Sequence, residues 1–124
     1  MTIIEAIHAI DSIKPNNYTE SDKVKWLSTL DGLVKIEVID THEGAEGVIF
    51  TGYDDNTLTD TKLLIPEPYA EKVYTQWLQS QIDFANEETA KYNNSSAVFN
   101  HTYGEFQKYY NRTHMPVIKQ RKYF

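Results

Sequence analysis

The stretch YNNSSAVFNHTYGEFQKYY, residues 92–110, decides the fold. Its aromatic residues recur at steps of seven, four, three and four positions, which is the spacing of one helix face. This pattern predicts a long helix that ends around Arg112, before Met115 and Pro116. A long helix with a rigid aromatic face, followed by a basic and apolar tail, suits a component of an assembly better than an enzyme. The members of this aromatic ladder are Tyr92, Phe99, Tyr103, Phe106 and Tyr110.

Two more helices are predicted near the start of the chain. Thr2 and Glu5 form a capping-box pattern that begins the first, and Pro15 ends it because the residue before proline disfavours helical angles. Thr19 or Ser21 caps the second helix, which fades between Thr41 and Gly44. Its predicted apolar stripe is Val24, Leu27, Leu30, Val34 and Val38, widened by Trp26, Leu33 and Ile36.

A third helix should start at Pro66-Glu67-Pro68, since proline fits the first turn of a helix. Its end has two readings. It stops near Asn86, or it continues to Tyr92 and breaks at Asn93-Asn94, so that Ser95 or Ser96 caps the last helix. One of its predicted apolar faces is Val73, Trp77 and Phe84.

Between the second and third helices, residues 42–65 lose the helical period. Glycines punctuate the short runs Val48–Thr51 and Lys62–Ile65, which could pair as a β-like hairpin or form an extended loop. Gly32 interrupts the second helix: either it lets another backbone approach closely, or it is a tolerated weak point of the helix. With little to bury, residues 44–65 should be the least protected part of an isolated subunit.

The fold class predicted is therefore all-α, with about four helices in a small bundle. Residues 1–114 form the helical domain, and residues 115–124 form a basic and apolar tail. The expected core combines large residues of all three later helices: Leu27, Leu30, Val34, Trp77, Phe84, Phe99, Tyr103 and Phe106.

The composition of the chain excludes some kinds of site and argues against some classes of function. The chain has 124 residues, no cysteine and a net charge of −6, so disulfides and thiolate metal sites are excluded. All 18 acidic residues lie before the tail, which carries only Lys119, Arg121 and Lys122. An acidic body argues against a sequence-reading nucleic-acid binder. Without a membrane-length apolar run or a secretory signal pattern, a cytosolic protein is expected.

The sequence offers little chemistry. His42, Glu43 and Glu46 lie close together but lack the second histidine of a helical zinc motif, so a solvated helix end is expected there. Asp54, Asp55, Asn56 and Asp60 lack the glycine and glutamate of a calcium loop. We therefore expect no catalytic residue, no cofactor, no metal and no enzyme activity.

Protein binding is the more promising activity. The tail mixes apolar and basic side chains, which suits a segment that leaves the bundle at Pro116 and folds onto an acidic, partly apolar partner. The alternative is that it folds back on its own bundle. The candidate partner-binding residues are Val117, Ile118, Lys119, Arg121, Lys122, Tyr123, Phe124, Ile49, Phe50 and Tyr53.

Six segments of the chain resemble one protein family. They are residues 25–32 (KWLSTLDG), 41–44 (THEG), 64–69 (LIPEPY), 81–86 (QIDFAN), 92–95 (YNNS) and 109–116 (YYNRTHMP). In these strings the chain resembles the head–tail connector, or head-completion adaptor, proteins of tailed phages and prophages. The resemblance covers nearly the whole chain, and none of its motifs is catalytic.

The resemblance implies a structural role. Subunits of this family would form a homo-oligomeric ring, commonly twelvefold, beneath the portal protein, and would extend the DNA channel toward a further neck or tail-completion protein. DNA would pass without sequence-specific binding, to which an acidic body is suited. The protein would sit in the virion neck, and in the host cytoplasm before assembly. The alternative from another class is a small regulatory or inhibitory protein that binds a host protein.

Overall fold

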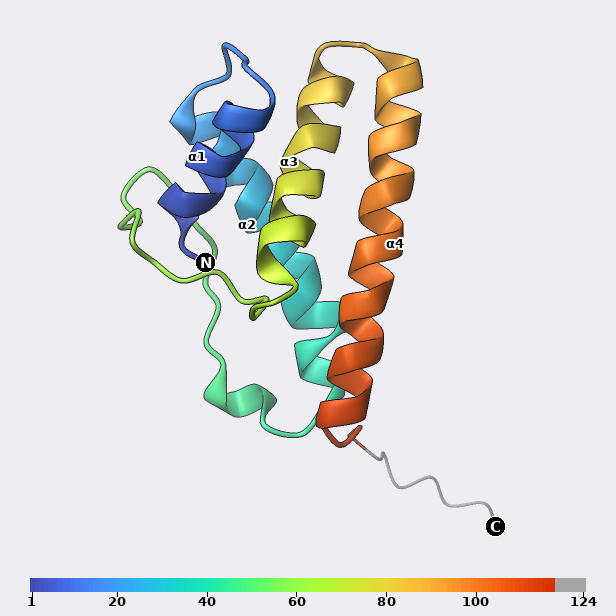
Figure 1. Ribbon diagram of the computed structural model, residues 1–124. Helices are drawn as coiled ribbons and strands as arrows, with labels where there is room; N and C mark the ends of the chain where they lie inside the picture. The colour runs from blue at the N-terminus through green and yellow to red at the C-terminus, as the bar shows by residue number, and fades with distance from the viewer. Residues whose placement is uncertain (118–124) are drawn as a thin grey trace.

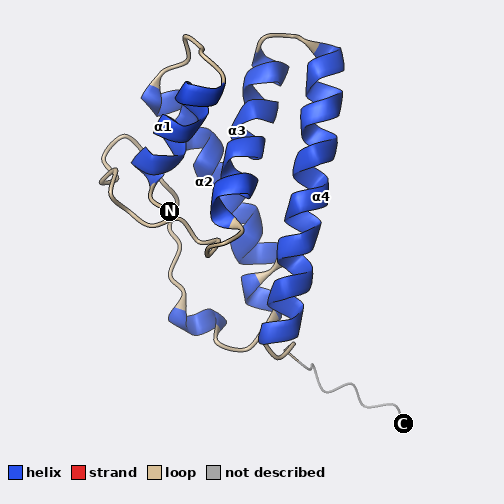
Figure 2. Ribbon diagram, viewed as in Figure 1, coloured by secondary structure: helices blue, strands red, loops and turns tan. Residues whose placement is uncertain are grey.

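The chain folds into a bundle of four α-helices, as the sequence predicts (Figures 1 and 2). The computed structural model describes residues 1–117. Helices α3 and α4 form an antiparallel hairpin, and α1 and α2 pack against α3. The helices are α1 (Ile3–Ile13), α2 (Glu20–Glu37), α3 (Ala70–Ala85) and α4 (Thr89–Thr113), with short 3-10 helices η1 (Ile39–Thr41) and η2 (Ala45–Gly47) after α2.

Capping residues set the starts of α1 and α2. The Thr2 side chain accepts the amide of Glu5, and the Glu5 carboxylate accepts the amide of Thr2 at 2.9 Å. Thr19 and Asp22 form the same reciprocal pair at the start of α2, which identifies Thr19 rather than Ser21 as its cap. Each pair satisfies amide groups that a helix leaves open at its first turn.

The boundary between α3 and α4 follows the first of the two readings. Helix α3 ends at Ala85, and α4 already begins at Thr89, so Asn93 and Asn94 lie inside it and the reading with a break there is wrong. Ser95 is buried, and its hydroxyl donates to Asp83 at 2.8 Å. This contact ties the two helices together near their turn, which a serine at a helix cap would not do.

The predicted hairpin between α2 and α3 does not form, and the extended-loop alternative describes this segment. Within residues 1–117 there is no strand, and Lys62 instead makes an antiparallel bridge with Thr2. The amide of Leu63 donates to Met1 at 2.9 Å, and the amide of Ile3 donates to Thr61 at 3.0 Å. The start of the chain thus takes the hydrogen bonds that the run Val48–Thr51 was expected to take.

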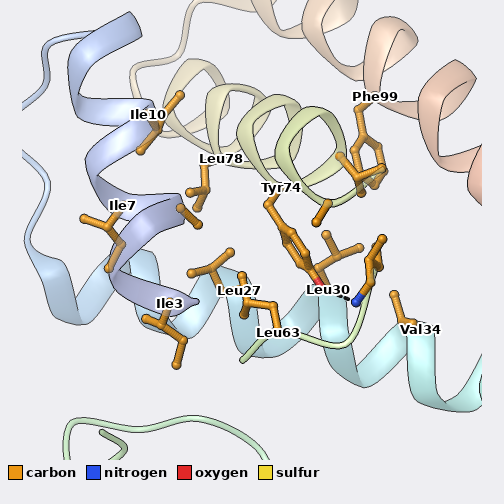
Figure 3. Close-up of a cluster of buried hydrophobic side chains, with 14 of the residues drawn as sticks. Ile3, Ile7, Ile10, Leu27, Leu30, Val34, Leu63, Tyr74, Leu78 and Phe99 are labelled. Atoms are coloured by element: carbon orange, nitrogen blue, oxygen red, sulfur yellow. Dashed lines mark hydrogen bonds between the residues drawn. The ribbon is translucent and has the colours of Figure 1, made fainter. Parts of the chain in front are cut away.

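The core lies where α1, α2 and α3 meet, and it extends between α3 and α4 (Figure 3). Trp77 and Tyr103 are half-buried, and Phe84 is 65% exposed, so the prediction for Phe84 is wrong. Phe84 lies in the last turn of α3, where its ring packs on Tyr92 at 5.3 Å between centroids. The predicted core residues that are buried are Leu27, Leu30, Val34, Phe99 and Phe106.

Candidate interaction surface

A buried carboxylate holds the loop between α2 and α3 against the bundle. Asp31 of α2 is fully buried, and its Oδ2 accepts hydrogen bonds from the Tyr53 hydroxyl at 2.5 Å and the Leu64 amide at 3.0 Å. Its Oδ1 accepts the Tyr74 hydroxyl of α3 at 2.6 Å. Because donors from two points of the loop and from α3 meet on one side chain, Asp31 fixes the loop relative to both helices.

Burial shifts the pKa values of the three ionisable side chains in this network. Desolvation raises the pKa of Asp31 above its ordinary value, against the opposite effect of its three hydrogen bonds. Desolvation and the neighbouring carboxylate also raise the pKa values of Tyr53 and Tyr74. Both hydroxyls therefore stay protonated at neutral pH and remain hydrogen-bond donors. The Tyr74 oxygen also accepts the Ile65 amide at 2.8 Å, so Tyr74 links α3 to the loop a second time.

The three loop residues predicted to bind a partner have different environments. Tyr53 is half-buried, and its hydroxyl belongs to the Asp31 network. Phe50 is also half-buried: its ring packs edge-on against Tyr53, and a ring carbon would lie 3.6 Å from a Cβ atom at Gly32. The neighbour of Gly32 is therefore a side chain at an ordinary contact distance, and no close backbone approach is seen there. Ile49 is 84% exposed and is the loop residue best placed to contact another molecule.

The outer side of α2 adds two apolar residues to this loop. Ile36 is 67% exposed and lies one helical turn beyond Gly32, on the side that Phe50 covers. Leu33 is 41% exposed. Both point away from the α2 residues that face the core, so they do not widen the buried stripe as the sequence suggested. We call Leu33, Ile36, Ile49 and Phe50 the α2 face.

The chain around the α2 face is acidic. Residues 36–61 contain no lysine or arginine, and only Asp40 among their carboxylates forms an ion pair within residues 1–117, with Lys35. Glu37, Glu43 and Glu46 are exposed. The acidic residues of this segment are Glu37, Asp40, Glu43, Glu46, Asp54, Asp55 and Asp60. The residues of the α2 face thus belong to an acidic stretch of the chain, although Lys62 lines a hollow together with Ile49 and Phe50.

The chain that follows α4 returns to the end of α2. The Glu43 amide donates to the Met115 carbonyl at 2.8 Å, and the Val117 amide donates to the Thr41 carbonyl at 3.0 Å. An antiparallel bridge joins His42 and Pro116 between these two bonds. The prediction that the chain leaves the bundle at Pro116 is therefore wrong, because the pairing continues through Val117.

His42 is the centre of this junction rather than a solvated helix end. It is buried, and its Nε2 lies 2.8 Å from the Asn111 Oδ1 of α4, while its Nδ1 lies 2.6 Å from the Val38 carbonyl. Its ring also packs edge-on against Tyr110, the last member of the aromatic ladder, at 4.8 Å. The sequence signal for this role was the apolar run Val38-Ile39 just before it, which buries the end of α2.

Of the tail residues predicted to bind a partner, the structure describes one. Val117 is 48% exposed at the junction with Thr41. The remaining candidates, which are Ile118, Lys119, Arg121, Lys122, Tyr123 and Phe124, lie outside the described residues.

A second surface feature lies at the turn between α3 and α4. A hollow of about 540 Å³ opens there, and Phe84 and Tyr92 form its aromatic side. Two carboxylates that line it form ion pairs: Glu88 with Lys91, and Asp83 with Lys14. Two of its carboxylates thus already have cationic partners.

Across residues 1–117 no cluster of three or more histidine, aspartate or glutamate side chains is arranged to hold a metal ion. Nor does any helix in that part of the chain combine the length and apolar character needed to cross a membrane. Comparisons of the chain with family models, with curated proteins and with solved structures find no match.

Proposed function

We propose that this protein is a structural subunit of a phage or prophage head–tail connector. It forms a ring at the portal, extends the DNA channel and offers a surface to a further neck protein. The observation that carries this proposal is the α2 face. Ile36 and Ile49 are both more than half exposed. Phe50, next to Ile49, lies over Gly32, one helical turn before Ile36. Exposed apolar residues that gather on a surface are typical of a protein–protein contact.

The family resemblance and the charge support the same function. The resemblance in strings spread over the chain implies an adaptor of this size and helical character. An acidic lining repels DNA phosphates, which lets a duplex slide through a ring without being held. The subunit would therefore be found in the host cytoplasm before assembly and in the virion neck afterwards, with a structural rather than a catalytic role.

Native mass spectrometry of the protein, alone and with the portal protein encoded beside its gene, tests this function. A ring, or a defined complex with the portal, supports it. Ile36→Glu should reduce assembly because it places a charge on the α2 face. Ile13→Glu is the matched control, since Ile13 is 60% exposed at the end of another helix.

Failure to assemble with itself or with the portal would overturn the proposed function. Capture of one host protein in a stoichiometric complex, with no portal binding, would favour a small regulatory or inhibitory protein instead. Gene neighbourhood separates the two in advance, because portal and capsid genes would flank a connector gene.

A further inference from the structure

We propose that residues 118–124, which we call the arm, dock on the α2 face of a neighbouring copy of the same chain. This inference rests on the proposed function. It names the contact that would join adjacent subunits of the ring. It commits to one occupant of the α2 face, the arm of a second copy.

The first support is the place where the arm begins. Val117 is bonded to Thr41, directly after α2, so the described chain ends beside the C-terminal turn that carries Ile36. Seven extended residues span at most about 23–25 Å. That reach is several turns of a helix, so an arm that starts at this end of one subunit can cover the same end of a subunit standing beside it.

The second support is chemical complementarity. The arm carries three apolar residues, Ile118, Tyr123 and Phe124, and the α2 face exposes Ile36 and Ile49. The other arm residues include Lys119, Arg121 and Lys122 and no acidic side chain. The chain that directly follows Ile36 carries the exposed carboxylates Glu37, Glu43 and Glu46. Apolar groups therefore meet apolar groups, and opposite charges surround them.

The third support is symmetry. An arm and its receiving surface are different parts of one chain, so docking between copies is heterologous: each subunit gives its arm to one neighbour and receives an arm from the other. A contact of this kind closes into a ring when its rotation allows. An arm that covered its own α2 face would occupy that surface without joining two subunits.

Two variants separate docking on a neighbour from docking on the same copy. The chain lacking residues 118–124 keeps an intact face and has no arm. Ile36→Glu keeps the arm and damages the face, and the exposure of Ile36 favours an undisturbed core. Replacing Lys119, Arg121 and Lys122 together by alanine provides a second arm variant that leaves the described fold untouched. Thermal unfolding of each variant checks that it is folded.

Native mass spectrometry should find oligomers of the full chain and only monomers of either variant alone. An equimolar mixture of the truncated chain and Ile36→Glu should give heterodimers, because the arm of one meets the intact face of the other. The triple alanine variant should not give heterodimers with the truncated chain.

Three results would overturn this contact. They are a truncated chain that oligomerises as the full chain does, a mixture that contains no heterodimer, and a full chain that remains monomeric. If the truncated chain still forms a ring, arm docking fails while the connector function stands. If heterodimers form but no variant or full chain binds a portal, the contact stands and the connector function fails.

Discussion

The hydroxyl of Tyr74 donates a 2.6 Å hydrogen bond to Oδ1 of Asp31, and both side chains are completely buried. Tyr74 belongs to α3 and Asp31 to α2, and the same tyrosine oxygen accepts the amide of Ile65 in the intervening loop. One hydroxyl thus joins two helices and a loop, and its removal leaves a buried carboxylate with fewer donors and a buried amide without an acceptor.

Tyr74→Phe should lower the free energy of unfolding by about 1–3 kcal/mol, the usual cost of leaving buried polar groups without partners. Urea denaturation measures this loss. Tyr92→Phe, a half-buried position outside the network, serves as the control and should change stability by only a few tenths of a kcal/mol. Equal losses of unfolding free energy in Tyr74→Phe and Tyr92→Phe would show that the hydrogen bonds to Asp31 add no stability beyond that of an ordinary tyrosine hydroxyl.

The network should also leave a signature in the pH dependence of stability. The pKa of Asp31 is raised in the folded protein above its ordinary value of 3.8, so the folded state holds this proton more tightly than the unfolded chain. Its contribution to stability is therefore fully present below about pH 3.8 and is lost as pH rises through the folded pKa.

The measurement compares the free energy of unfolding of the natural chain with that of Asp31→Asn across acidic and neutral pH. Their difference isolates Asp31, since the other carboxylates are common to both. The natural chain should lose stability relative to Asp31→Asn as the pH rises. A relative gain with rising pH would mean that the hydrogen bonds outweigh desolvation and that the pKa is lowered.

Two aromatic residues near the α3–α4 packing should respond very differently to truncation. Phe99→Ala should cost about 3–5 kcal/mol, because Phe99 is 7% exposed and packs between Trp77 and Tyr103. Phe84→Ala should cost about 1 kcal/mol or less, because Phe84 is largely exposed and packs on Tyr92. Thermal denaturation of the two variants side by side tests the pair, and similar losses would contradict it.

Two glycines should likewise respond in opposite directions to alanine. Gly32 is helical, and a Cβ atom there would meet Phe50 at an ordinary contact distance of 3.6 Å, so Gly32→Ala should stabilise the protein by roughly 0.5–1 kcal/mol. Gly52 has φ +91°, so Gly52→Ala should cost roughly 1–2 kcal/mol. Chemical denaturation of both variants checks the signs, and a destabilised Gly32→Ala would mean that Phe50 packs too tightly for a methyl group.

Hydrogen exchange should divide the loop between α2 and α3 into two parts. The amides of Leu64 and Ile65 donate to Asp31 and Tyr74 and should exchange slowly. The amides of Ile49 and Thr51, for which residues 1–117 supply no acceptor, should exchange fast. Residue-resolved exchange by NMR tests this division, and uniform protection from residue 44 to residue 65 would refute it.

Local rules predicted the helices well because those rules act within a few residues. The capping pair Thr2–Glu5 needed no knowledge of the rest of the chain, whereas the local pattern left two readings for the end of α3. The hairpin prediction failed because the partner of Lys62 is Thr2, at the far end of the sequence. Helical periodicity placed Phe84 on an apolar face of α3. It could not show that this face is largely exposed at the last turn of the helix, where Phe84 lies.

The candidate surface was predictable only in part. The sequence predicts a partner contact for Ile49, whose side chain is exposed. It predicts Ile36 as part of the apolar stripe of α2, but the helical angle of Ile36 places it opposite Leu27 and the structure leaves it exposed. Asp31 gave a signal that went unused: an acidic residue between Leu30 and Val34, within the apolar stripe of α2, must find buried donors. The sequence alone could not identify those donors as Tyr53 and Tyr74, because the loop path that brings them together depends on the whole fold.

The junction between residues 41–43 and 115–117 has a mechanical consequence. A pull on the C-terminal end of the chain first reaches the two backbone hydrogen bonds that flank the His42–Pro116 bridge. From there the force passes through His42 to Asn111 on one side and Val38 on the other, so α2 and α4 share it. We therefore expect the last turn of α4 to unwind under tension only after these hydrogen bonds have broken.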